Sequence, residues 1–313
     1  MSRLALAAAA LLVSGCQALA GVAVGAFYDT ADLPEAQIRR DVAYLPDGDP
    51  RHRLNLFLPA PGAPVQPTVV FVHGGGWDSG GRDLVAGGRD VYNNIGRYLA
   101  SEGIPTAVVS YRLASVDGGA LVDWRAQARD VAAALAFIGR EEASWGSRGV
   151  VAMGHSAGTH LALHAALNPA FRDPAGVAGV CGLVPASGAG LDLTAEGVFV
   201  GDTYDYFSSR FAPDRVTLAE PPAVPADWQR EVSVVPFVTA EAPPMLILLG
   251  TGESAGLKLQ SRLLDRARVA AGAPGAFVDV PARSHTLVVP TLSRGDRVAG
   301  PAVVAFVKGL TCG

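Results

Sequence analysis

The sequence is poor in charged residues and has no excess of positive charge. Aspartate, glutamate, lysine and arginine together make up 17% of the 313 residues, against about 25% in an average soluble domain. Disorder requires low hydrophobicity and high charge, and half of this chain is apolar, so the composition excludes a disordered protein. The net charge of −4, with no basic stripe to neutralise phosphates, argues against nucleic acid as a partner.

Hydrophobic runs long enough to span a membrane are also missing. Residues 4–13 form an unbroken apolar run after a short start that contains Arg3. The run is too short for a bilayer-spanning helix, which needs about 20 residues, but it has the length of a signal-peptide core. No later window is both long enough and uncharged, so the remainder is expected to be soluble apart from any lipid tether.

The apolar run ends in Leu-Val-Ser-Gly-Cys at residues 12–16, which resembles a bacterial lipoprotein signal. The resemblance implies cleavage after Gly15 and acylation of Cys16. Residues 1–15 are then the signal peptide, residues 16–40 a tether and N-terminal segment, and residues 41–313 the folded domain. Gln17 follows the cysteine in place of aspartate, which favours a lipid-anchored protein of the cell envelope, at the outer membrane and facing the periplasm. The alternative is an ordinary secretory signal in which Cys16 is incidental.

Cysteine is scarce, with three residues in the chain. No pair has the spacing of a zinc site. Cys181 lies in the apolar run 176–184 and is expected to be a buried core thiol. A disulfide between Cys181 and Cys312 is the alternative, in a compartment that permits one.

The pattern of apolar runs predicts a single α/β domain. A hairpin is expected over 41–45 and 54–58, around a Pro- and Gly-containing turn, and apolar strands then alternate with amphipathic helices. Strands are predicted at 68–72, 106–111, 149–153, 176–184, 245–249 and 276–280, and helices at 90–100, 121–138, 157–167, 257–271 and 301–310. Buried strands alternating with helices imply a mostly parallel central sheet with helices on both faces.

Residues 187–241 break this alternation. The segment is rich in glycine, proline and acidic residues, and it carries six aromatic side chains: Phe199, Tyr204, Tyr206, Phe207, Phe211 and Trp228. A long irregular segment inside a compact domain is usually a lid, a binding loop or poorly ordered. We expect a cap-like excursion whose aromatic residues line an acyl or aryl pocket; the alternative is a surface flap that these residues only anchor.

Ser156 is the expected nucleophile. It is the serine of a Gly-His-Ser-Ala-Gly sequence at 154–158, between an apolar strand and an apolar helix, which is the context that a nucleophile elbow requires. The flanking glycines let the backbone approach closely on a tight turn. The helix that begins there directs its dipole at a developing oxyanion.

A His-Gly-Gly-Gly-Trp sequence at 73–77 follows the first predicted parallel strand. Consecutive glycines can turn their amide hydrogens toward a ligand because no side chain intrudes. We expect the N–H groups of Gly75 and Gly76 to form an oxyanion hole together with that of Ala157, the residue after the nucleophile.

These segments together resemble α/β-hydrolases. The resemblance is carried by residues 73–77, by Tyr-Arg-Leu at 111–113, by Asp130, and by Gly-His-Ser-Ala-Gly-Thr-His-Leu from residue 154. The chain is similar, over about residues 41–307, to the esterase and lipase group that includes feruloyl-esterase-like and kynurenine-formamidase-like proteins. The resemblance implies the α/β-hydrolase fold, with nucleophile, acid and histidine following one another along the chain, and it implies no metal or organic cofactor.

His285 is the expected base among six histidines. In that chain order the base lies near the C-terminus, and His285 is the histidine that follows the last predicted strand. His160 and His164 are four residues apart on the helix after Ser156. They lack the glutamate of a His-Glu-x-x-His zinc site, so we expect packed helix residues there and no metal.

Glu253 is the expected acid. It occupies the matching place of a Gly-x-x-acid loop, where the family usually has aspartate, and a glutamate can still accept a hydrogen bond from the imidazole. The alternative role for Glu253 is to favour the start of the next helix. Among other carboxylates, Asp279 lies within the last strand, and Asp202 or Asp205 could reach the site only from the excursion.

The leading hypothesis is therefore a serine hydrolase that cleaves carboxylic esters of small-molecule substrates, of undetermined acyl chain length, through a covalent acyl-enzyme. An arylformamidase-like hydrolase of small amides is an alternative with the same mechanism. A catalytically inactive, lipid-anchored binding or scaffold protein is the alternative from another class, and it predicts an eroded triad.

Overall fold

The computed structural model describes residues 28–114, 122–199, 203–212, 224–289, 292–293 and 295–312. The predicted signal peptide and Cys16 lie outside these residues. Within the described ranges, no helix combines the length and apolarity needed to cross a membrane.

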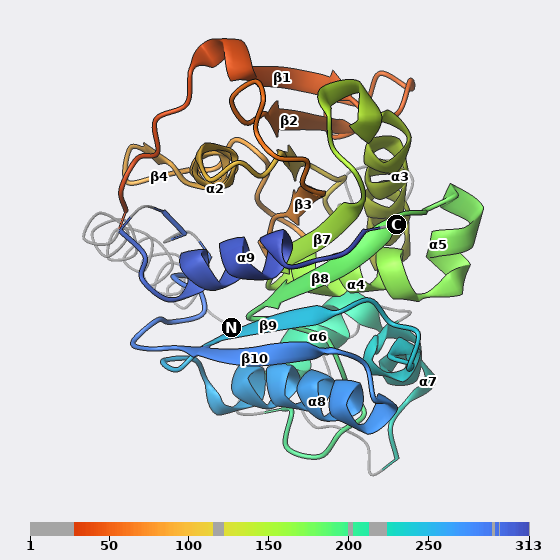
Figure 1. Cartoon of the computed structure of the whole chain (residues 1–313). Coiled ribbons are helices and arrows are strands. Elements are labelled where there is room, and N and C mark those ends of the chain that lie inside the picture. The colour runs from red at the N-terminus through yellow and green to blue at the C-terminus, as the bar shows by residue number, and fades with distance from the viewer. Residues whose placement is uncertain are drawn as a thin grey trace, which may run out of the picture.

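Eight strands of the described chain form one central sheet (Figure 1). In spatial order they are β1 (Ile38–Ala43), β2 (Arg53–Phe57), β6 (Thr106–Val109), β3 (Thr68–Val72), β7 (Val150–His155), β8 (Val180–Ala186), β9 (Met245–Gly250) and β10 (Gly275–Val280). The β1–β2 and β2–β6 pairs are antiparallel, and the pairs from β6–β3 to β9–β10 are parallel. The mostly parallel sheet and the predicted hairpin are confirmed. A separate short ribbon joins β4 (Val85–Ala86) to β5 (Arg89–Asp90).

Helices cover both faces of the sheet, as predicted. One face carries α2 (Val91–Ser101) and α9 (Ala299–Lys308), and the other carries α3 (Trp124–Glu141), α4 (Ala157–Leu167), α5 (Pro169–Ala175) and α8 (Ala255–Ala271). Short 3-10 turns occur at η1 (Glu35–Gln37), η2 (Glu142–Trp145) and η3 (Val235–Phe237).

The two faces build two apolar cores, which explains why the central strands are continuous hydrophobic runs. In β3, Val70 and Val72 pack with α3 and α4, whereas Val69 and Phe71 pack with α2. Successive side chains of a strand point to opposite faces, so a strand covered on both sides must be apolar at every position.

The excursion contains regular structure, so the expectation of an irregular segment is wrong in part. It includes α6 (Thr203–Phe211) and α7 (Asp227–Val232). Tyr204, Phe207 and Phe211 are spaced three and four residues apart and are buried on one side of α6. This helical spacing is a signal that the composition of the segment obscured.

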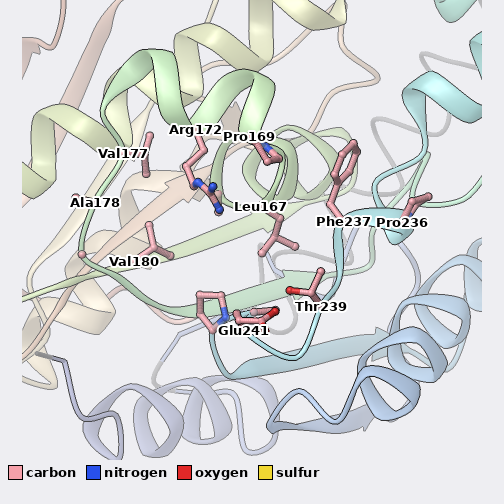
Figure 2. Close-up of a pocket in the computed structure, with 14 residues that line it drawn as sticks. Leu167, Pro169, Arg172, Val177, Ala178, Val180, Pro236, Phe237, Thr239 and Glu241 are labelled. Atoms are coloured by element: carbon pink, nitrogen blue, oxygen red, sulfur yellow. The ribbon is translucent and has the colours of Figure 1, made fainter.

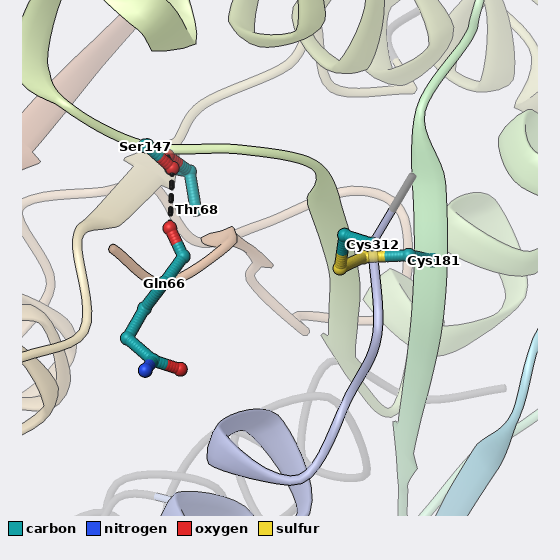
Figure 3. Close-up of a disulfide and its surroundings, with 5 residues drawn as sticks. All are labelled: Gln66, Thr68, Ser147, Cys181 and Cys312. Atoms are coloured by element: carbon teal, nitrogen blue, oxygen red, sulfur yellow. Dashed lines mark hydrogen bonds between the residues drawn. A yellow bond between two sulfur atoms is a disulfide. The ribbon is translucent and has the colours of Figure 1, made fainter. Parts of the chain in front are cut away.

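Cys181 and Cys312 form a disulfide, with 5.4 Å between their Cα atoms (Figure 3). The expectation of a free core thiol at Cys181 is therefore wrong. The chain after α9 returns across β8, which brings together two cysteines that are 131 residues apart. Gly149, with φ +88°, lies beneath the bridge, where an added Cβ would come within 2.6 Å of the Cβ of Cys312.

Candidate active site

Three side chains meet beyond the carboxyl ends of parallel strands. Ser156 follows β7, Glu253 follows β9 and His285 follows β10. The Nε2 atom of His285 lies 2.7 Å from Ser156 Oγ, and its Nδ1 atom lies 3.3 Å from Glu253 Oε2. The structure thus brings together a hydroxyl, an imidazole and a carboxylate from the three residues singled out in the sequence, at the edge where α/β sheets bind ligands.

The turn at Ser156 is strained, and its glycines are required by close packing. Ser156 has φ 54° and ψ −124°, a conformation that L-residues rarely adopt, between β7 and α4. A Cβ on Gly154 would lie 2.4 Å from the carbonyl oxygen of Gly158, and a Cβ on Gly158 would lie 2.2 Å from that of Val72. Both glycines therefore let the elbow fit tightly between α4 and β3.

Glu253 is held as a buried carboxylate. Burial raises the pKa of Glu253, but hydrogen bonds from His285, from Ser187 and from the Gly250 amide outweigh it and leave the pKa below its usual value. The Gly250 N–H donates to Oε1 at 3.2 Å, and the Ser187 hydroxyl donates to the same oxygen. The acid therefore stays ionised and presents its second oxygen, Oε2, to His285.

Ser187 is a site residue that the sequence did not reveal. It follows β8 directly, is fully buried and has φ 47°. No motif marks it, and a lone serine after a buried strand has no specific signal. Its link to Glu253 depends on β8 lying beside β9, which only the fold shows.

His155, the residue before the nucleophile, supports the backbone of the candidate base. Its Nε2–H donates to the carbonyl oxygen of His285 at 2.7 Å. Burial lowers the pKa of His155 to about 4, so the ring is neutral near pH 7. His155 therefore holds the His285 loop without placing a positive charge beside the imidazole.

Hydrogen bonds orient the peptides of the loop at residues 73–77, which follows β3 and is called the glycine loop below. His73 Nδ1–H donates to the Gly74 carbonyl at 2.7 Å, and the N–H and hydroxyl of Ser79 donate to the Gly75 carbonyl at 3.0 and 2.7 Å. The C=O and N–H of a planar trans peptide point in opposite directions, so these bonds fix where the N–H groups of Gly75 and Gly76 point.

The same loop lies against the elbow. A Cβ on Gly74 would lie 3.0 Å from the Cβ of Ser156. Ala157 begins α4, and the first amides of a helix have no intrahelical acceptor. The structure therefore places the loop that carries Gly75 and Gly76 against the turn that carries Ser156 and Ala157.

His73 is itself fixed by the segment that carries the family resemblance at 111–113. Tyr111 stacks on the His73 ring, with 4.2 Å between ring centroids, and donates to the His73 carbonyl at 2.9 Å. Arg112 makes a two-pronged ion pair with Asp130, at 2.9 and 2.6 Å. Burial lowers the pKa of His73 to about 4, which keeps it neutral.

A cavity of about 210 Å³ opens beside Ser156 and His285. Tyr206 and Phe207 of α6, Leu257 of α8 and Val198 contribute to its wall. Two of the six aromatic residues of the excursion therefore line the pocket, as expected. Four others, Phe199, Tyr204, Phe211 and Trp228, pack with the core, which is the anchoring role of the alternative hypothesis.

Two larger hollows have no residue of the Ser156–His285–Glu253 group in their walls. One, of about 400 Å³, is lined by residues that precede β8 and β9, with Arg172 and Glu241 on opposite sides of it (Figure 2). It lies at the amino ends of the parallel strands, opposite the triad. The other, of about 410 Å³, is lined by residues 50–51, 80–85 and 110.

His160 and His164 are buried helix residues. Their Nε2 atoms lie 2.8 and 3.0 Å from the carbonyl oxygen of Val232, and burial lowers the pKa of both rings. In the part of the chain that the structure describes, no group of three His, Cys, Asp or Glu side chains is placed to hold a metal ion.

Comparison with known proteins adds a partial sequence match. Residues 54–176, from β2 to the end of α5, match the family model described as BD-FAE. The isoprenylcysteine alpha-carbonyl methylesterase of Arabidopsis thaliana is 31% identical over 140 residues, which are 44% of this chain and 29% of that protein. The chain spans about 30% of the length of the curated relatives it matches.

Solved structures match nearly the whole chain. A truncated carbohydrate esterase from gut microbiota has a TM-score of 0.69 and 20% identity, over 90% of this chain and 96% of that one. Esterase B from Lactobacillus rhamnosis, inhibited by a tributyrin phosphonate, has a TM-score of 0.69 and 21% identity, over 98% and 95% of the two chains. These likenesses show that the chain has the α/β-hydrolase fold.

Proposed function

We propose that the protein is a serine hydrolase that cleaves small carboxylic esters through a covalent acyl-enzyme. The proposal rests on the hydrogen-bonded chain Ser156–His285–Glu253 beside a cavity, with contacts of 2.7 and 3.3 Å. The methylesterase and esterase names of the similar proteins support ester cleavage.

Acylation begins when Ser156 Oγ attacks the ester carbonyl carbon. His285 Nε2 takes the hydroxyl proton, and Glu253 stabilises the imidazolium through Nδ1–H. The carbonyl π electrons move to oxygen, and the resulting oxyanion is bound by the N–H groups of Gly75, Gly76 and Ala157. When the intermediate collapses, the carbon–oxygen bond to the alcohol breaks and His285 protonates the leaving oxygen.

Deacylation repeats these steps with water as the nucleophile. His285 Nε2 accepts a proton from the water that attacks the acyl-enzyme carbonyl, and then returns it to Ser156 Oγ as the acid leaves. The 24% exposure of the His285 side chain leaves it accessible to that water.

The cavity favours a small substrate. Its volume of about 210 Å³ lies below the roughly 300–1,000 Å³ of pockets for drug-sized ligands. The apolar side chains of Val198, Phe207 and Leu257 suit a short alkyl acyl group. We therefore infer a preference for esters of acids with a few carbon atoms.

The test is a turnover panel on the full chain in detergent, with Ser156→Ala as the control. The panel holds acetate, butyrate and dodecanoate p-nitrophenyl esters, a feruloyl ester and an N-formyl aromatic amine. We expect hydrolysis of the short esters that Ser156→Ala abolishes, and faster turnover of the formyl amine would identify the arylformamidase alternative. A folded protein that hydrolyses nothing and does not react with an active-serine phosphonate would refute catalysis and leave the scaffold hypothesis.

We also propose that the protein is anchored in the cell envelope by a lipid at Cys16, at the outer membrane and facing the periplasm. The Cys181–Cys312 disulfide supports an oxidising compartment, where such bridges persist. The test compares the full chain with Cys16→Ser in detergent phase partitioning after expression in bacteria. The wild type should enter the detergent phase and Cys16→Ser the aqueous phase; equal partitioning would refute the anchor.

A further inference from the structure

The hydroxyl of Tyr206 lies beside the predicted oxyanion hole. Tyr206 lines the same cavity as Ser156 and His285. A Cβ built on Gly76 would lie 2.4 Å from the Tyr206 hydroxyl oxygen. With standard bond lengths, the hydroxyl oxygen is therefore no more than about 5 Å from the Gly76 amide nitrogen, close enough for both groups to contact one substrate oxygen.

Arg210, one helical turn further along α6, fixes Tyr206 to the glycine loop. Its guanidinium carbon lies 3.7 Å from the centroid of the Tyr206 ring. Its Nε–H donates to the Gly76 carbonyl at 3.0 Å, and Nη2–H donates to Asp78 at 2.8 Å. A single side chain thus holds the tyrosine ring and the loop in one arrangement.

The Tyr206 hydroxyl can act as a donor throughout the neutral pH range. Burial raises the pKa of Tyr206, and the charge and hydrogen bond of Arg210 offset that rise only in part. Arginine has no acceptor, so the stacking of Arg210 on the Tyr206 ring leaves the hydroxyl proton available for a substrate.

We propose that Tyr206 is a catalytic residue, a side-chain donor to the oxyanion that adds to the N–H groups of Gly75, Gly76 and Ala157. The inference rests on the proposed ester hydrolysis and adds a residue to its machinery. As Ser156 attacks, negative charge moves onto the carbonyl oxygen, and the bond from the Tyr206 O–H strengthens as that charge grows. The carbonyl oxygen gains no proton in this step, because Tyr206 keeps its own.

Tyr206→Phe tests this role with little other change, because the ring that stacks on Arg210 remains. Tyr204→Phe is the matched control. It removes a hydroxyl two residues earlier on the same helix, from a side chain that is 1% exposed and packs against Phe199 and Trp228. Thermal melts of the full chain establish that both variants fold.

Three rates are compared: kcat/KM for p-nitrophenyl acetate, kcat/KM for ethyl acetate, and the rate of covalent inhibition by diethyl p-nitrophenyl phosphate. Each reaction places negative charge on one oxygen in the oxyanion hole. We expect Tyr206→Phe to lower all three about 10- to 100-fold, and Tyr204→Phe to change them less than about twofold.

Other results would overturn the assignment. If Tyr206→Phe stays within about threefold of the wild type in all three rates, the hydroxyl does not bind the oxyanion. A fall confined to ethyl acetate would place the hydroxyl at the leaving oxygen, because p-nitrophenolate leaves without a proton. If the wild type neither hydrolyses the esters nor reacts with the phosphate, the proposed function itself fails, and the role of Tyr206 fails with it.

Discussion

Replacing Glu253 by glutamine should reverse one hydrogen bond and disable the triad. Two donors, the Ser187 hydroxyl and the Gly250 N–H, face Oε1 of Glu253. In the Glu253→Gln variant the amide oxygen must occupy that position, because the amide nitrogen would oppose both donors. The amide NH₂ group then faces Nδ1 of His285.

The reversed bond selects the wrong tautomer of His285. Nδ1 must accept from the glutamine amide, so the ring proton moves to Nε2, and Nε2 can no longer take the proton of Ser156. In a serine protease with a Ser-His-Asp triad, changing the triad aspartate to asparagine lowers kcat about 10⁴-fold. The 3.3 Å contact between Glu253 and His285 is longer than the roughly 2.7–2.9 Å of a strong charge-assisted bond. We therefore expect a smaller loss in kcat/KM, of about 10²- to 10³-fold.

The assay is kcat/KM for p-nitrophenyl acetate at pH 7.5, with Asp279→Asn as the control. Asp279 is the carboxylate nearest to His285 in sequence, but it lies in β10 with its side chain 52% exposed and faces Arg262. Asp279→Asn should leave turnover unchanged. A loss below about fivefold in Glu253→Gln, or an equal loss in Asp279→Asn, would show that Glu253 is not the acid of the triad.

Three further predictions follow from the contacts of the site and the core. Ser187→Ala should lower kcat/KM about 3- to 10-fold, because Glu253 loses a donor that holds it ionised, and steady-state kinetics measure the loss. Cys312→Ala should lower the free energy of unfolding by about 2–4 kcal/mol and the melting temperature by about 4–8 °C, because the disulfide closes a long loop. Calorimetry measures the shift, and equal melting temperatures of the variant and the wild type would refute it. Acid should destabilise the fold between pH 6.5 and about 4, because the folded pKa of the buried His73, His155 and His164 lies near 4 and the unfolded chain takes up their protons first. Urea unfolding should therefore give a lower free energy of unfolding at pH 5 than at pH 7, and equal values would refute this.

The parts of the site that lie in local motifs could be predicted from the sequence. Ser156 and the glycine loop lie in short segments whose conformation is set by adjacent residues. The predicted strand, turn and helix around them were therefore sufficient to predict their place in the fold. His285 and Glu253 required the chain order of the family resemblance, because neither has a motif of its own. The mostly parallel sheet followed from apolar runs that mark strands buried on both faces.

Contacts between distant segments could not be predicted in the same way. The role of Ser187 depends on β8 pairing with β9, and the disulfide depends on the path of the chain after α9. Helix α6 was missed because glycine, proline and acidic residues around it masked the spacing of Tyr204, Phe207 and Phe211. In each case the decisive partner lies far away in sequence or is hidden by the composition of its surroundings.

Strained backbone conformations cluster at the edge of the sheet that carries the candidate active site. Five non-glycine residues in the described ranges have positive φ, and four of them, Trp77, Ser156, Ser187 and Ala282, follow β3, β7, β8 and β10 at the edge that carries the triad. Each such conformation costs of order 1–3 kcal/mol and persists only where surrounding contacts enforce it. Ser156 carries the hydroxyl that contacts His285, Ser187 carries the hydroxyl that donates to Glu253, and Ala282 lies in the turn that leads to His285. The packing of β7 against α4 and of β8 against β9 provides the contacts that enforce these conformations at Ser156 and Ser187, and so holds in place the geometry that we propose to be catalytic.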